Sequence, residues 1–221
     1  MMLSAYVFDA YGTLFDVHAA IDRHRTAVGA DAQRFSELWR TKQLEYSWTL
    51  TLAGHYVDFS KLTERALDFA FARFPSVDRG LRAKLLEAYL TLDAFPDVHT
   101  ALTGLKSRGA RLAILSNGTP AMLGSAIEAA AMQGLLDGVF SVDAVRRYKP
   151  RREVYALVTE GLGIEPSDTG FVSSNRWDVM GAVSFGFKAF WINRSGAPNE
   201  YPDQGPEREI PGLGELLQAA L

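Results

Sequence analysis

The sequence predicts an α/β protein with a doubly wound, mostly parallel sheet and an inserted helical subdomain. Short apolar runs rich in β-branched residues recur at 6–8, 112–115, 139–142, 170–172 and 188–192. Stretches with helical patterning separate most of them, at 98–108, 120–134, 152–162 and 177–185. Strands that alternate with helices pair in parallel through right-handed crossovers, so this order predicts a Rossmann-like sheet.

The segment 16–94 breaks the alternation. It carries helix-like patterns at 34–46, 61–74 and 81–90, and no convincing strand. We therefore expect an α/β core domain formed by residues 1–15 and 95–221, with residues 16–94 inserted after the first strand as a helical cap subdomain. The tail 196–211 is rich in Pro, Gly and charge, which predicts a surface loop before a short final helix.

Composition excludes several classes of function. The net charge of −3 provides no general attraction for nucleic acid or for an anionic membrane. The absence of cysteine rules out disulfides, thiolate zinc sites and a cysteine nucleophile. No apolar run approaches membrane length, and the N-terminus lacks a cationic segment ahead of an apolar one. We expect a cytoplasmic protein whose partner is a small molecule.

Polar residues follow the predicted strands, at the edge where doubly wound sheets bind their ligands. They are Asp9, Ser116, Asn117, Asp143, Lys149, Ser173, Ser174, Asn175 and Asp178. Because the carboxyl ends of parallel strands share one edge, these side chains are expected to form a compact site. Asp9 taken alone could equally cap the turn that follows it.

Four segments together resemble the haloacid dehalogenase superfamily. They are FDAYGTL at 8–14, LSNG at 115–118, YKP at 148–150 and SSNRWD at 173–178, in the family's order and near its spacing over almost the whole chain. The cap stretch WRTKQLEYSW at 39–48 is similar to the L-2-haloacid dehalogenase branch in particular. Membership of that branch implies a homodimer without a cofactor. It also implies hydrolysis of short (S)-2-haloalkanoic acids to (R)-2-hydroxy acids and halide, with inversion, through an ester of Asp9.

Most members of the superfamily are phosphatases, so the residues must choose between reactions. A phosphatase needs a proton donor for its leaving group and Mg²⁺ beside its carboxylate. Phosphatases of the family resembled here place that donor two residues after the nucleophile, where this chain has Tyr11, and place acidic metal ligands after the fourth strand. Here Ser173, Ser174 and Asn175 follow that strand, with only Asp178 beyond. Halide departs without a proton, and a haloacid is a monoanion. We therefore expect no metal site, with a Mg²⁺-dependent phosphatase and a non-catalytic binding module as the alternatives.

Six residues have predicted catalytic roles. Asp9 would attack the substrate, Lys149 would keep Asp9 ionised, and Thr13 would donate a hydrogen bond to Asp9. Asp178 would position or deprotonate the water that hydrolyses the ester, helped by Asn175 and Ser173. Lys149 could instead be a surface lysine, and Asp178 could also cap the helix that follows it.

Eight further residues are predicted to bind the substrate. Ser116, with N–H groups near Asn117, would hold the carboxylate, although Ser116 or Thr119 could merely cap a helix. Arg40 would hold the departing halide, since its charge does not titrate away, or it could be a solvated helix residue. Asn117 and Phe59 resemble its partners in the branch.

The remaining members of this set are apolar or aromatic. Tyr155 resembles a tyrosine near the reacting centre of the branch, but it could be a core residue. Trp177, Tyr11 and Leu44 would form apolar walls that exclude water, or simply belong to the core. Arg176 is bulkier and more basic than is usual in the branch, which bears on the pocket entrance and on substrate size.

Overall fold

The computed structural model describes residues 3–219 and contains a six-stranded sheet with strand order β3-β2-β1-β4-β5-β6. Every pairing between neighbours is parallel, which confirms the predicted fold class. The strands are β1 (Ala5–Phe8), β2 (Arg111–Ser116), β3 (Gly138–Ser141), β4 (Thr169–Ser173), β5 (Lys188–Ile192) and β6 (Arg208–Ile210).

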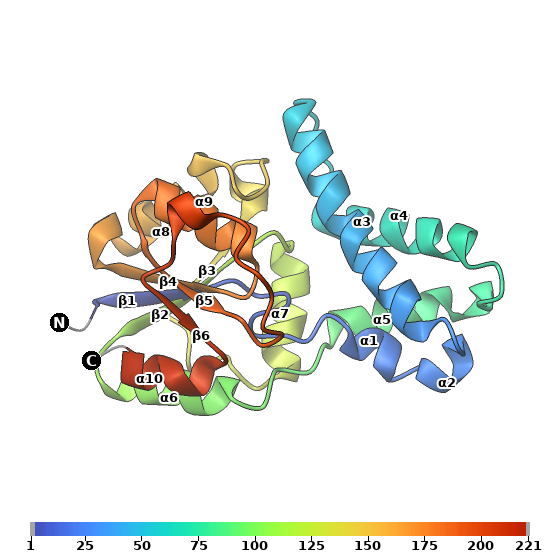
Figure 1. Cartoon of the computed structure of the whole chain (residues 1–221), viewed down its shortest axis with the longest axis horizontal. Helices are drawn as coiled ribbons and strands as arrows, with labels where there is room; N and C mark the ends of the chain where they lie inside the picture. The colour runs from blue at the N-terminus through green and yellow to red at the C-terminus, as the bar shows by residue number, and fades with distance from the viewer. Residues whose placement is uncertain (1–2, 220–221) are drawn as a thin grey trace.

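Helices cover both faces of this sheet. In Figure 1, α8 (Arg152–Leu162) and α9 (Arg176–Phe185) lie on one face, and α6 (Val98–Ser107) and α10 (Leu216–Ala219) lie on the other. The helix α7 (Pro120–Ala129) connects β2 to β3. Central strands β1 and β4 are buried along their whole length, which explains why their sequences are continuous apolar runs rather than alternating ones.

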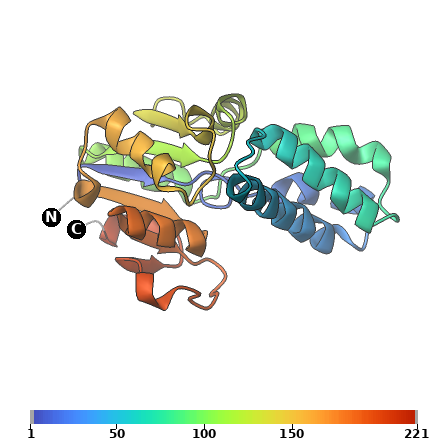
Figure 2. The same ribbon diagram turned by 90° about the horizontal axis from the view of Figure 1, so that it is seen from above.

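Five helices gather beyond the carboxyl ends of the strands (Figure 1), and the view from above shows the same separation (Figure 2). They are α1 (Ala19–Asp22), α2 (Arg25–Val28), α3 (Ala32–Leu52), α4 (Phe59–Arg73) and α5 (Arg82–Leu90). Buried hydrogen bonds join α3 to α4, because Trp39 Nε1 donates to Thr63 O and Gln43 Nε2 donates to Thr63 Oγ1, each at 2.9 Å.

The chain enters and leaves this helical group at two adjacent segments. Phe95 N donates to Leu14 O at 2.9 Å, and Asp16 N donates to Asp93 O at 2.9 Å. The division into a core and a cap at residues 15–16 and 94–95 stays a prediction. No helix within residues 3–219 is long and apolar enough to cross a membrane.

The structure corrects several predicted elements. The predicted loop at 196–211 is wrong at its end, since residues 208–210 form β6 and pair with β5. Two of the three residues of β6 are exposed and charged, so no apolar run marks this strand. The helix α3 continues six residues beyond the predicted end at 46, and α7 stops at Ala129. The short helices α1 and α2 were not predicted.

A tight turn follows β1. Gly12 has a φ of +96°, a conformation that L-residues with a side chain rarely adopt. Its backbone N–H donates to Phe15 O at 2.7 Å, and a Cβ added to it would lie 3.3 Å from Ser174 Oγ. The turn after β1 is therefore closely fitted to the loop after β4.

Gly12→Ala is expected to destabilise the protein more than Gly54→Ala. Gly54 also has a positive φ, of +72°, but a Cβ there would meet nothing within 4 Å. Gly54→Ala should lower the free energy of unfolding by about 1–2 kcal/mol, and Gly12→Ala by roughly 1 kcal/mol more because its Cβ also crowds Ser174. Denaturant unfolding measures both, and equal losses would contradict the close fit of the two loops.

Candidate active site

Asp9 lies directly after β1, and its backbone N–H donates to Val172 O of β4 at 2.9 Å. Its carboxylate is almost fully buried and receives three hydrogen bonds. Lys149 Nζ lies 3.0 Å from Oδ1, while Thr13 Oγ1 and Asn175 Nδ2 donate to Oδ2 at 3.1 and 2.8 Å. These donors fix the orientation of the carboxylate.

Lys149 is buried, not a surface lysine, with 1% of its surface exposed. Its Nζ lies 2.9 Å from Asp178 Oδ2 as well as beside Asp9. Burial alone would lower the pKa of Lys149, but the charges of Asp178 and Asp9 outweigh burial and hold that pKa above its ordinary value. Its backbone N–H donates to Asn117 Oδ1 at 3.2 Å, which ties the lysine loop to the end of β2.

Asp178 is fully buried behind Lys149. Burial raises the pKa of Asp178 to about 6, against the opposing charge of Lys149 and with a further increase from Asp9. Tyr155 Oη donates to Asp178 Oδ1 at 2.7 Å, so Tyr155 contacts this carboxylate in addition to packing in the core. Asp178 lies inside the first turn of α9, because Asn175 occupies the N-cap position.

The loop after β4 holds the turn after β1 in place. Ser174 N donates to Thr13 Oγ1 at 2.9 Å, and Ser174 Oγ donates to Gly12 O at 2.8 Å. Ser173 Oγ accepts from Asn175 N at 3.1 Å, so Ser173 shapes the loop that presents Asn175 to Asp9. Together these contacts determine where Asp9 and its donors lie relative to each other.

At the end of β2, two hydroxyl groups have different surroundings. Thr119 is the N-cap of α7, and its Oγ1 accepts from Met122 N at 3.2 Å. Ser116 Oγ accepts from Gly118 N at 3.1 Å, and within the described residues its own hydrogen has no acceptor. The capping role therefore belongs to Thr119, and Ser116 retains a donor beside the start of α7.

The cap-side helices reach this site through Arg40. Arg40 Nη2 donates to Tyr11 O at 3.0 Å. The ring of Tyr11 stacks on Tyr89 of α5, with centroids 5.6 Å apart and planes 12° apart, and lies 6.1 Å from Phe59. Tyr89 was not predicted as a site residue, because nothing in the local sequence of α5 distinguishes it from a core aromatic. Its Oη donates to Gln43 Oε1 at 3.3 Å.

A cleft of about 790 Å³ opens beside Asn175, and Arg40 and Trp177 also line it. Leu44 lies half-buried on α3, one turn after Arg40. Lys149, Thr13 and Asn175 bind Asp9 directly. Asp178, Asn117 and Ser173 each bind one of these three residues, and Tyr155 binds Asp178.

Arg176 is buried, and its guanidinium faces the loop that precedes β6. Its Nε donates to Asn199 Oδ1 at 2.8 Å, and its Nη2 donates to the carbonyl oxygens of Tyr201 and Gln204. The guanidinium carbon also lies 5.8 Å from the ring centroid of Trp191. Arg176 thus anchors the C-terminal loop to the first turn of α9.

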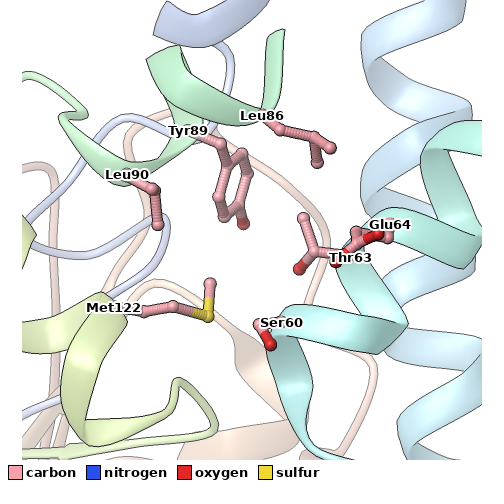
Figure 3. A pocket seen from close by; sticks show the side chains of 7 residues that line it. All are labelled: Ser60, Thr63, Glu64, Leu86, Tyr89, Leu90 and Met122. Atoms are coloured by element: carbon pink, nitrogen blue, oxygen red, sulfur yellow. The ribbon is translucent and has the colours of Figure 1, made fainter. Parts of the chain in front are cut away.

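A separate cavity of about 150 Å³ lies among α4, α5 and α7 (Figure 3). In Figure 3 the hydroxyl of Tyr89 points into it, opposite the sulfur of Met122, and Leu86 closes one side. None of the sequence-predicted site residues lines this cavity. The cavity is therefore separate from the candidate active site.

The polar group does not fit the Mg²⁺ site of the family phosphatases. Among residues 3–219, the group around Asp9 holds two carboxylates, Asp9 and Asp178, and both bind the ammonium of Lys149. Within residues 3–219, no three His, Asp or Glu side chains are grouped so that they could hold a metal ion.

The sheet, the Asp9 turn and the buried lysine together define a class of hydrolase. The model of the haloacid dehalogenase-like hydrolase family matches residues 3–186, and the chain belongs to that family. Within it, the chain is 46% identical to (S)-2-haloacid dehalogenase 4A of Burkholderia cepacia, over 97% of this chain and 93% of the relative.

Two further comparisons identify the same branch. The chain is 46% identical to (S)-2-haloacid dehalogenase 1 of Pseudomonas sp. (strain CBS-3), over 99% of this chain and 97% of the relative. The solved structure of the L-2-haloacid dehalogenase from Xanthobacter autotrophicus superposes with a TM-score of 0.90 at 37% identity, covering 98% of each chain. The resemblance predicted from the four motifs and the cap stretch is confirmed.

Asp178 is expected to titrate at a pH of about 6, measured by carboxyl ¹³C NMR. Tyr155→Phe should raise this pKa further, because the hydrogen bond from Tyr155 favours the ionised carboxylate. Asp137 is a suitable control, since the hydrogen bond from Leu112 N holds its pKa below the ordinary value. Titration of Asp178 at the ordinary value for aspartate would contradict the inferred effect of its burial.

Proposed function

We propose that this protein is an (S)-2-haloacid dehalogenase that hydrolyses short 2-haloalkanoic acids to (R)-2-hydroxy acids and halide. The observation that carries the proposal is the position of Lys149, which pairs with both Asp9 and Asp178 inside the protein. This arrangement places a cationic side chain of the protein beside the nucleophile, where a phosphatase would need a metal ion. Tyr11, whose pKa burial raises far above neutral pH, provides no acid for an alkoxide leaving group.

In the first half-reaction, an oxygen of Asp9 attacks C2 of the substrate on the side opposite the halogen. A carbon–oxygen bond forms, the carbon–halogen bond breaks, and the halogen leaves with the electron pair as halide. Thr13, Asn175 and Lys149 hold the carboxylate for this displacement. Attack from the back inverts C2, which converts an (S)-haloacid to an (R)-hydroxy acid.

Two sets of residues would bind the charged ends of the reacting substrate. Ser116 and the backbone near Asn117, at the start of α7, would bind the carboxylate of the substrate. Arg40, with Asn117 and Phe59, would stabilise the departing halide. The role of Arg40 is supported by its hydrogen bond to the carbonyl oxygen of Tyr11, which follows the nucleophile Asp9 by two residues in the sequence.

In the second half-reaction, water attacks the ester carbonyl of Asp9. Asp178 accepts a proton from this water and returns it to the alkoxide oxygen as the bond between that oxygen and the carboxyl carbon of Asp9 breaks, which releases the hydroxy acid. The carboxyl group left on Asp9 then loses its remaining proton to solvent, which regenerates the carboxylate. A pKa of about 6 leaves Asp178 ionised at neutral pH and able to accept this proton. Below that pH its protonated form accumulates, so ester hydrolysis should slow about tenfold per pH unit.

We also propose that residues 16–94 act as a cap over this site and that the protein works in the cytoplasm as a homodimer. Leu90 and Val139 support a partner surface, because both are large apolar side chains with at least 40% of their area exposed. Sedimentation velocity would decide the oligomeric state. A single monomeric species at micromolar concentration would reject the dimer.

Halide release from (S)-2-chloropropionate in the presence of EDTA is the first test, with (R)-lactate as the expected product. Asp9→Ala should lower kcat/KM by about three orders of magnitude or more, because it removes the nucleophile. Asp143→Asn is a matched control, since Asp143 follows β3 but binds Tyr56 of the cap instead of Lys149. Phosphate release that requires Mg²⁺, without any halide release, would identify a phosphatase instead.

Asp178→Asn should separate the two half-reactions. The displacement at C2 does not require a base, so one equivalent of halide should be released while the ester on Asp9 accumulates and is detected as a mass increase. In the unaltered protein, turnover in H₂¹⁸O should place ¹⁸O in Asp9. If ¹⁸O enters only the hydroxy acid during multiple turnovers, water attacks C2 directly and Asp9 is not the nucleophile.

A further inference from the structure

An apolar pocket of about 340 Å³ lies on the side of Trp177 away from the Asp9 turn, between the end of α3 and the core. Its walls are almost entirely carbon. The residues that shape it are Trp48, Leu52, Pro150, Trp177, Met180 and Tyr201. Leu52, at the outer end of α3, is 86% exposed, so the pocket opens to solvent at that end.

Two residues connect this pocket with the proposed reaction. Lys149 lines the pocket with its main chain, because its side chain is fully buried and its ammonium binds Asp9. Trp177 lines both this pocket and the polar cleft beside Asn175. The ring of Trp177 is therefore a wall that the pocket shares with the cleft beside the reacting centre.

The helix α3 extends from the polar cleft, which Arg40 lines, to the apolar pocket, which Trp48 lines. Arg40, Leu44 and Trp48 are spaced four residues apart, so they lie along one side of the helix. Trp48 is about 12 Å from Arg40 along the axis, at the usual rise per residue. An alkyl chain attached to C2 and directed away from the halide would thus follow Leu44 toward Trp48.

The inner end of the pocket is closed by an aromatic contact across the boundary of α3 and α9. The rings of Trp48 and Trp177 meet edge to face, with centroids 5.3 Å apart and planes at 80°. Both indole Nε1 atoms are buried, and neither has a hydrogen-bond partner among the described residues. Because no hydrogen bond fixes either ring, only the edge-to-face contact and the local packing keep the two rings in place.

We infer that this pocket is a subsite for the apolar chain of longer 2-haloacids, and that Trp48 is the gate that limits chain length. The inference rests on the proposed dehalogenase function. A substrate as short as 2-chloropropionate leaves the Trp48–Trp177 contact intact. A chain of six or more carbons displaces the Trp48 ring and occupies the pocket against Pro150 and Met180.

The test compares kcat/KM for (S)-2-bromooctanoate with that for (S)-2-bromopropionate. Trp48→Ala should raise this ratio by about threefold to tenfold, because the edge contact no longer has to be broken. Met180→Trp should fill the pocket and lower the ratio, with little change for bromopropionate. Leu86→Ala, which truncates a leucine beside the separate cavity of Figure 3, should leave the ratio unchanged.

Trp48→Leu provides the same test with less loss of packing if Trp48→Ala fails to fold. An unchanged ratio in the Trp48 variants and in Met180→Trp overturns the inference. Calorimetric binding of octanoate, compared with propionate, is independent of halide chemistry. If no substrate releases halide, the proposed function fails, while octanoate affinity that Met180→Trp weakens still supports the subsite; octanoate that binds no tighter than propionate rejects it.

Discussion

The structure depends on one buried cation shared by two carboxylates. Lys149, Asp9 and Asp178 are almost completely removed from water, and burial of such charges costs several kcal/mol per ion unless each is paired and hydrogen-bonded. The necessary partners come from three separate loops and from the helices α8 and α9. Burial of Asp178 outweighs its ion pair with Lys149 and raises its pKa, and the nearby charge of Asp9 raises that pKa further.

The sheet and the inserted helices contribute different residues to the site. Parallel strands bring their carboxyl ends to one edge, so β1 and β4 place Asp9 and the Asn175 loop in direct contact. The inserted helices contribute the guanidinium of Arg40 and the aromatic rings that surround Tyr11. Arg40 reaches the Tyr11 carbonyl, and Tyr89 stacks on the Tyr11 ring, so the residue in the phosphatase acid position becomes the contact point between the two parts.

Much of this arrangement could be predicted because it depends on the order of apolar and polar residues within short segments of the sequence. Continuous apolar runs indicated the five longer strands, and the polar residues after them indicated the cluster around Asp9. The strand β6 escaped prediction because it is three residues long and mostly charged, and its order comes from pairing with β5. Tyr89, Trp48 and the partners of Arg176 escaped for a related reason: their roles arise from contacts between distant segments, which leave no periodicity in the sequence.

The paired segments at residues 14–16 and 93–95 have an evolutionary consequence. Backbone hydrogen bonds hold the two ends of the inserted segment side by side. The geometry at which the chain leaves and re-enters the sheet therefore does not depend on the length of the insert. The entropic cost of a longer connection grows only slowly with the number of residues. A lineage could therefore exchange one lid for another, and with it the range of molecules admitted, while leaving the buried charges of the sheet edge undisturbed.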